Sequence, residues 1–122
     1  MNISDHLEAI NTDNSSVQIV AFADLSVQLV LADSTKNEIG QEHLDTLCAQ
    51  VADAFDSPLQ TGTPSLVEQP TEVVVMRDDG VLISLRPTHD SSNALYLLCD
   101  YDVDINGAMA MARNALTETG AV

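Results

Sequence analysis

A short turn between two apolar runs constrains the fold of this chain more than any other feature of its sequence. Asp78-Asp79-Gly80 separates Glu72–Arg77 from a second β-prone run at 81–86, which Pro87 ends. Asp-Gly between two apolar runs is the strongest short signal for a β-hairpin. After a polar turn at 88–92, a third β-prone run covers 94–99. The second half of the chain therefore predicts three consecutive strands.

The first half predicts a helix followed by a second hairpin. Ile3, Leu7 and Ile10 recur at helical spacing, and the pattern breaks in the polar run 11–16. The β-prone runs 17–23 and 27–32 follow, separated by the tight turn Asp24-Leu25-Ser26. We expect these two strands to pair antiparallel, with a polar loop at 33–37 after them.

Two further helices are predicted from apolar stripes. One stripe consists of Leu44, Leu47, Cys48, Val51 and Phe55. The segment 57–70 contains three prolines and a glycine and predicts a connecting loop. The second stripe consists of Ile105, Ala108, Met109, Ala112 and Leu116, with Asp104 as the expected N-cap.

The predicted class is α+β, with a five-stranded antiparallel sheet, helices on both faces and the order α-β-β-α-β-β-β-α. At 122 residues the chain suffices for one domain over 1–122. Both faces of the strands are apolar, since Val73 and Val75 alternate with Val74 and Met76. Three short helices cover such a sheet sparingly, so we expect part of it to be buried against a second copy of the chain.

The charge of the chain excludes some classes of partner. Asp and Glu number 19 against four Lys and Arg, for a formal net charge of −15. Such a protein repels phosphate backbones and anionic lipids, so no nucleic acid or membrane partner is expected. Neither a signal peptide nor a membrane anchor is recognised, which predicts a cytoplasmic protein. Cys48 and Cys99 lie in apolar patterns and are expected to be free, buried and unreactive.

Candidate sites for chemistry are few, and each has a structural interpretation. Asp102 to Gly107 matches the first half of a calcium loop, D-x-D-x-N-G, but its twelfth position holds Arg113, so a helix start is the favoured interpretation. The histidines, His6, His43 and His89, have no metal-ligand spacing. No nucleophile motif or phosphate-binding loop is present. The sequence therefore predicts no catalytic residue, no cofactor and no metal.

Arg77 and Arg86 flank the second hairpin. They could pair with a partner's carboxylate or act on a bound GTPase, but arginines at strand ends usually solvate the sheet edge and limit unwanted pairing. The edge interpretation is favoured.

The order of elements resembles the roadblock family, the superfamily of dynein light chains and regulators of Ras-like GTPases. The hairpin and helix within 17–55 resemble the first half of that family. The run 73–87 (VVVMRDDGVLISLRP), the strand segment Leu95-Tyr96-Leu97-Leu98 and the helix start Ile105-Asn106-Gly107 resemble its second half more closely.

The resemblance implies homodimers in which the third strand and the central helix pair with their symmetry mates. By position, the dimer interface would include Leu44, Leu47, Cys48, Val51, Glu72, Val73, Val74, Val75, Met76 and Arg77. The function implied is a non-catalytic protein-interaction scaffold that regulates or docks a small Ras-like GTPase. The alternative is a type III-type secretion chaperone that binds an extended effector segment. Such chaperones are also small, acidic and dimeric, but usually place three strands after the first helix.

Overall fold

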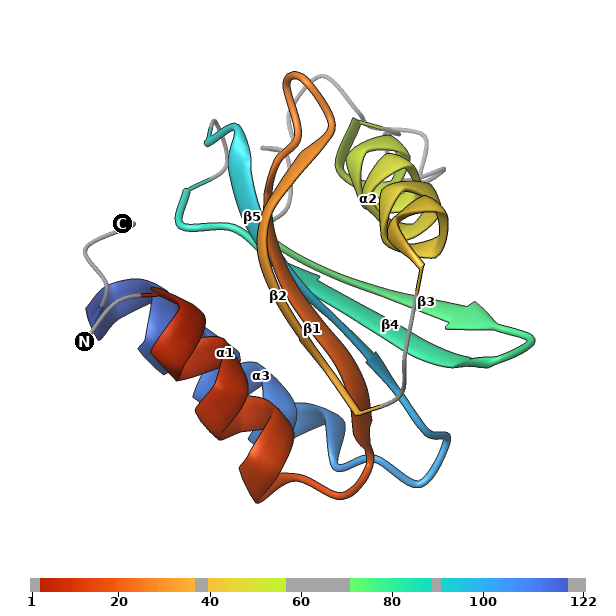
Figure 1. Cartoon of the computed structure of the whole chain (residues 1–122), viewed down its shortest axis with the longest axis vertical. Helices are drawn as coiled ribbons and strands as arrows, with labels where there is room; N and C mark the ends of the chain where they lie inside the picture. Colours follow the sequence, from red (N-terminus) through yellow and green to blue (C-terminus); the bar gives the residue numbers. More distant parts are fainter. Residues whose placement is uncertain (1–2, 37–39, 57–70, 89–90, 119–122) are drawn as a thin grey trace, which may run out of the picture.

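The computed structural model describes residues 3–36, 40–56, 71–88 and 91–118, and the elements follow the predicted order (Figure 1). The helices are α1 (Ile3–Asp13), α2 (Gln41–Asp56) and α3 (Ile105–Glu118). The strands are β1 (Val17–Asp24), β2 (Leu29–Thr35), β3 (Glu72–Arg77), β4 (Gly80–Leu85) and β5 (Asn93–Cys99). The predicted loop at 57–70 lies outside the described residues.

All five strands form one antiparallel sheet in the order β2-β1-β5-β4-β3. Helix α2 covers one face, and α1 and α3 lie together on the other (Figure 1). The α+β class and its helices on both faces are therefore confirmed. β5 is the central strand, and β2 and β3 form the two edges.

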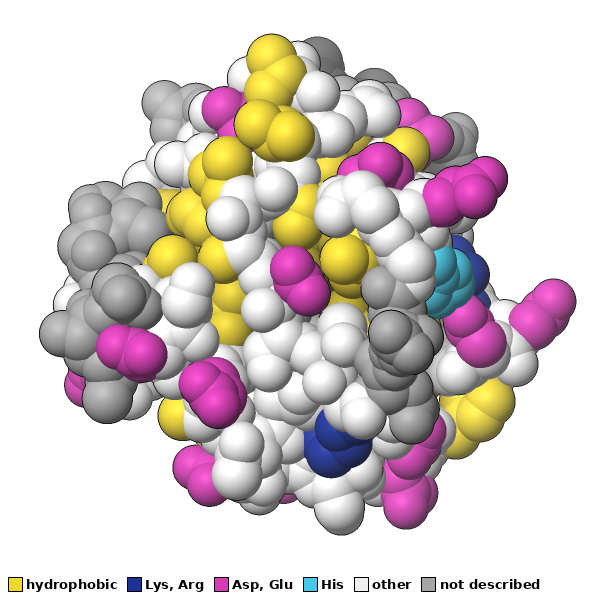
Figure 2. Space-filling view, viewed as in Figure 1, with side chains coloured by type: hydrophobic (Ala, Val, Ile, Leu, Met, Phe, Trp, Pro, Cys, Tyr) yellow, Lys and Arg dark blue, Asp and Glu magenta, His cyan; other side chains and the backbone are white. Residues whose placement is uncertain are grey.

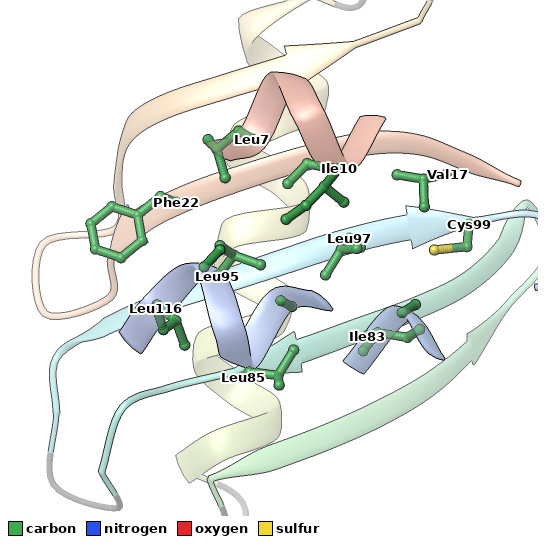
Figure 3. Close-up of a cluster of buried hydrophobic side chains, with 14 of the residues drawn as sticks. Leu7, Ile10, Val17, Phe22, Ile83, Leu85, Leu95, Leu97, Cys99 and Leu116 are labelled. Atoms are coloured by element: carbon green, nitrogen blue, oxygen red, sulfur yellow. The ribbon is translucent and has the colours of Figure 1, made fainter. Parts of the chain in front are cut away.

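The core has two layers because the sheet is covered on both faces. Leu7 and Ile10 of α1 and Leu116 of α3 pack on Leu95 and Leu97 of β5 in one layer (Figure 3). The apolar stripe of α2 packs on the opposite face in the second layer. Every residue of β4 is buried, as expected for an interior strand with apolar residues on both faces.

The first hairpin differs from its prediction. The strand β2 runs to Thr35, because residues 33–35 pair with 19–21 of β1 despite their polarity. The turn is not the tight Asp24-Leu25-Ser26: Asp24 pairs with Leu29, so the loop spans 25–28, and Gln28 has a φ of 52°. A register shift at Phe22/Ala23 leaves Leu31 as an extra residue in β2, which is a β-bulge.

The second hairpin forms as predicted. Arg77 pairs with Gly80 across the turn residues Asp78 and Asp79. The N-cap of α3 is also confirmed, since the main-chain N–H of Gly107 donates to the carboxylate of Asp104 at 3.2 Å.

Candidate functional site

The strand β3 presents an open edge. It pairs with β4 on one side, and no strand among the described residues pairs with its other side. In a hairpin with a two-residue turn, Arg77, Val75 and Val73 exchange hydrogen bonds with β4. The bond from the main-chain N–H of Arg86 to the carbonyl of Thr71, at 2.9 Å, fits this alternation. The main-chain groups of Glu72, Val74 and Met76 therefore point outward, where another strand could pair with them.

The side chains of β3 alternate between two environments. Val73 and Val75 are partly buried beside the α2 layer of the core. Val74 and Met76 lie on the opposite face and are 39% and 66% exposed. The helices α1 and α3 do not bury this outer strand, in line with the expectation that three short helices cover the sheet sparingly. We call the open main-chain row with Val74 and Met76 the β3 edge.

Polar contacts fix the end of the β3–β4 hairpin. The guanidinium of Arg77 donates to both carboxylate oxygens of Asp79, at 2.8 and 3.3 Å, and to the side-chain carbonyl of Gln50 in α2. The hydroxyl of Tyr101 donates to the main-chain carbonyl of Arg77. Hydrogen bonding from Arg77 holds the pKa of the Asp79 carboxyl below its usual value. These contacts hold one end of the β3 edge in a defined position.

The four α2 residues assigned to the dimer interface, Leu44, Leu47, Cys48 and Val51, lie in the core of their own chain, each at most 3% exposed. A second copy packed on α2 would contact the solvent-facing side of the helix instead. That side carries exposed Glu42, Asp45, Thr46 and Asp53. It stays a prediction that α2 packs on a second copy of the chain.

A hydrogen bond between Tyr96 and Leu44 helps to position α2 on the sheet, and no pattern in the sequence predicts it. The hydroxyl of Tyr96 in β5 donates to the main-chain carbonyl of Leu44 at 2.9 Å, in a buried position. Burial raises the pKa of the Tyr96 phenol far above its usual range. The phenol therefore stays protonated and acts as a fixed donor.

The structure corrects the interpretation of one arginine. Arg86 does not solvate a sheet edge: it is 4% exposed, and its guanidinium carbon lies 4.4 Å from the ring centroid of Phe55. It follows the interior strand β4, where α2 covers it. Arg77 does lie on an edge strand, with 20% of its side chain exposed.

The two remaining cations also make intramolecular contacts. Arg113 of α3 donates to the carbonyl of Arg86 at 2.7 Å and forms an ion pair with Glu72 at 3.3 Å. The ammonium of Lys36 lies 2.5 to 2.7 Å from four oxygens: the carbonyls of Asn11, Asn14 and Val17, and the side chain of Asn11. These oxygens lie at and just beyond the end of α1, where a cation is favourable.

Residues weighed for chemistry have structural contacts. Both cysteines are buried and free; burial raises the pKa of Cys48, and that of Cys99 to about 12, which opposes thiolate formation. Asp102 accepts a hydrogen bond from Ser16 at 2.9 Å, while Asp104 caps α3. In the described part of the chain, no group of three His, Cys, Asp or Glu residues could hold a metal. His89 lies outside the described residues.

The other edge strand exposes apolar residues that the sequence analysis did not single out. Val27, Leu29 and Leu31 are 67%, 53% and 52% exposed at the β1–β2 hairpin. Their spacing of two residues was the available signal, but the sequence analysis treated the run 27–32 only as a β-prone strand. None of the helices in the described ranges is long and apolar enough to cross a membrane.

Comparisons with known proteins identify the fold. No family model matches the sequence, and no curated protein matches it. The Roadblock/LC7 domain from Streptomyces avermitilis is similar in structure, with a TM-score of 0.76 at 12% identity, covering 98% of this chain and 96% of that domain. The chain has the roadblock/LC7 fold.

Two further neighbours are structures of one particular protein, MglB. A structure of MglB with a tetrameric arrangement has a TM-score of 0.76 at 16% identity, covering 96% of this chain and 84% of the other. Myxococcus xanthus MglB has a TM-score of 0.72 at 11% identity, covering 95% and 92%. The resemblance seen in the sequence is thus confirmed at the level of the fold.

Proposed function

We propose that this chain is a cytoplasmic, non-catalytic homodimeric scaffold that docks or regulates a small Ras-like GTPase. The observation that carries the proposal is the β3 edge: an unbulged edge strand with an open main-chain row and two exposed apolar side chains, Val74 and Met76. Unprotected edges of this kind pair readily with another strand.

The two edges of the sheet differ in their capacity to pair. The edge strand β2 has a bulge at Leu31 and an exposed carboxylate at Asp33, and both features disfavour strand addition. The strand β3 has an uninterrupted register along its whole length. Strand pairing between copies is therefore expected at β3 and not at β2.

Hydrogen-bond geometry limits the register of the proposed dimer. Only Glu72, Val74 and Met76 point their main-chain groups outward, so these residues must face outward-pointing residues of the second copy. An antiparallel two-fold pairing then centres on Val73, Val74 or Val75. In each of these registers, apolar side chains of the two copies face each other across the seam.

The partner class rests on the roadblock resemblance and on the fold. Regulators of Ras-like GTPases belong to the superfamily that the sequence resembles, and self-association is supported by MglB in a tetrameric arrangement. The chaperone alternative has less support, because two strands and not three follow α1.

The dimer is tested by light scattering coupled to size exclusion at micromolar concentration. The wild-type chain is expected at twice its mass of 13.0 kDa, and the double variant Val74→Lys/Met76→Lys at one mass. Leu29→Lys/Leu31→Lys on β2 is the matched control, with the same two new charges on the other edge, and is expected to stay dimeric. Circular dichroism checks the folding of each variant. A monomeric wild type contradicts the dimer.

The partner is tested by titrating Ras-like GTPases from the same organism, loaded with GDP or a GTP analogue. Binding that depends on the nucleotide, or a changed rate of GTP hydrolysis, is expected for the wild type. A dimer that binds none of them, but binds an extended effector segment, would favour the chaperone alternative.

A further inference from the structure

The β1–β2 hairpin forms an apolar surface at one end of the molecule. Val27, Leu29 and Leu31 are each more than half exposed, and all three lie within the five residues 27–31. Figure 2 shows hydrophobic side chains gathered at the top of the view, where Figure 1 places this hairpin. Contiguous exposed apolar residues of this kind mark interaction sites more often than scattered ones do.

Carboxylates surround this apolar surface. Asp24 pairs with Leu29 in the register, Asp33 follows Leu31 by two residues, and Asp45 is exposed on α2. Burial is the main cause of the raised pKa of the Cys48 thiol, and the charges of Asp45 and Asp24 add to it. Asp33 and Asp45 likewise both act on Tyr96. Asp33 pairs with Ala21 of the α2 layer and so lies on the same face as Asp45, whereas Asp24 and Leu29 pair on the face of Phe22. The three carboxylates therefore flank the β2 edge from both faces of the sheet.

The basic side chains of the chain make contacts away from this surface. Arg77 pairs with Asp79, and Arg113 pairs with Glu72 on α3's side of β3. Lys36 is bound by oxygens at and just beyond the end of α1. An apolar surface with a negative rim is complementary to apolar residues flanked by Lys or Arg.

The bulge decides which form of partner fits. Leu31 is the extra residue of β2, so the outer main-chain row is interrupted where an added strand would pair. Recognition must then go through side chains. An apolar helix face carries side chains at intervals of about 6 Å along its axis, and it can lie against Leu29 and Leu31 without pairing main-chain groups.

We propose that Val27, Leu29 and Leu31, together with Asp24, Asp33 and Asp45, dock a basic amphipathic helix of a partner protein. This proposal adds the chemistry of a partner to the proposed scaffold function. It rests on that function only in assuming that a partner protein exists. It does not require pairing at the β3 edge.

The test uses the full chain and a synthetic, fluorescently labelled helical peptide of about 18 residues, long enough for stable helical turns. The peptide carries Leu at i, i+3, i+4 and i+7 and Lys elsewhere, and a counterpart replaces every Lys with Glu. Anisotropy titrations at fixed ionic strength compare the wild type with Leu29→Ser/Leu31→Ser and Asp33→Asn. Glu118→Gln on α3 is the charge-matched control.

The wild type is expected to bind the Lys peptide and not the Glu peptide. The double Leu variant is expected to bind at least about tenfold more weakly, in line with the loss of two buried apolar side chains. Asp33→Asn is expected to bind about two- to fivefold more weakly, and Glu118→Gln as the wild type does. Val74→Lys/Met76→Lys is expected to keep the binding, which separates this proposal from the dimer.

Three outcomes overturn the proposal. Equal weakening by Asp33→Asn and Glu118→Gln, with no effect of the double Leu variant, would show attraction to net charge alone. Equal binding of the Glu peptide would show that the carboxylates do not select the partner. A wild-type mass of four chains that falls to two in Leu29→Ser/Leu31→Ser would show that a second copy covers this surface.

Discussion

The hydroxyl of Tyr96 donates a buried hydrogen bond, 2.9 Å long, to the main-chain carbonyl of Leu44. Tyr96 is fully buried in the central strand β5, and Leu44 lies in the first half of α2. The bond joins residues 52 positions apart and fixes where α2 lies on the sheet. The bond therefore ties the first half of α2 to the central strand of the sheet.

Tyr96→Phe is expected to lower the free energy of unfolding by about 1 kcal/mol, since it removes one buried hydrogen bond and little volume. Urea denaturation followed by circular dichroism measures the change. Tyr101→Phe is the matched control: its hydroxyl is at an exposed position, so a smaller loss is expected. Equal losses in the two variants would contradict a special role for the buried bond.

Gly80→Ala is expected to destabilise the chain by on the order of 3 kcal/mol. Gly80 has a φ of 147°, and a Cβ there would collide with the main-chain oxygen of Cys99 in β5. Thermal unfolding measures the effect. Gly40→Ser, where a Cβ meets no atom within 4 Å, is the control and is expected to unfold near the wild-type temperature.

Ser84→Ala is expected to stabilise the chain by about 1 kcal/mol, because a buried polar group without a partner costs desolvation free energy. The Ser84 hydroxyl is fully buried, with no hydrogen-bond partner in the described part of the chain. Ser34→Ala is the opposite case, since Ser34 accepts a bond from Asn11 at 3.0 Å, and is expected to destabilise. A loss of stability in Ser84→Ala would indicate an unseen partner.

The contribution of Asp79 to stability is expected to depend on pH. Because its folded-state pKa is lowered, chiefly by the Arg77 hydrogen bond, the contribution is present above the unfolded pKa and is lost as the pH falls through the folded pKa. Asp79→Asn should therefore melt below the wild type at neutral pH and converge with it in acid. Asp78→Asn, in the same turn, is the control. If an NMR titration gave the Asp79 carboxyl the pKa of an ordinary aspartate, the expectation would be contradicted.

Salt is expected to stabilise both the chain and the proposed dimer. At a net charge of −15 the excess carboxylates repel one another. Salt weakens this repulsion, because the Debye screening length falls from about 10 Å at 0.1 M to about 3 Å at 1 M. Melting temperature and dimer mass are measured against sodium chloride concentration. The variant Glu42→Gln/Asp45→Asn/Asp53→Asn, which removes charge from α2, should respond less. A melting temperature that falls with salt would contradict this expectation.

Local sequence signals were sufficient for most elements. Asp79-Gly80 located the second hairpin, and the α2 stripe from Leu44 to Phe55 located the central helix and the face it buries. The end of β2 was missed because Asp33, Ser34 and Thr35 are held in the sheet by β1, not by their own preferences.

The candidate site was only partly predictable. The edge position of β3 came from the family resemblance, whereas the exposure of Val74 and Met76 depends on how far α1 and α3 extend over the sheet. The burial of Arg86 over Phe55 requires α2 to lie above the end of β4, which no local pattern in the sequence records.

The bulge at Leu31 bears on how far assembly can proceed. A sheet with two equally adhesive margins would recruit copy after copy and grow into an open-ended fibre. Here the irregular margin adds no strand, so growth by strand addition would finish once the regular margins of two molecules are joined. In the proposed assembly, one extra residue would thereby separate a finite particle from a polymer.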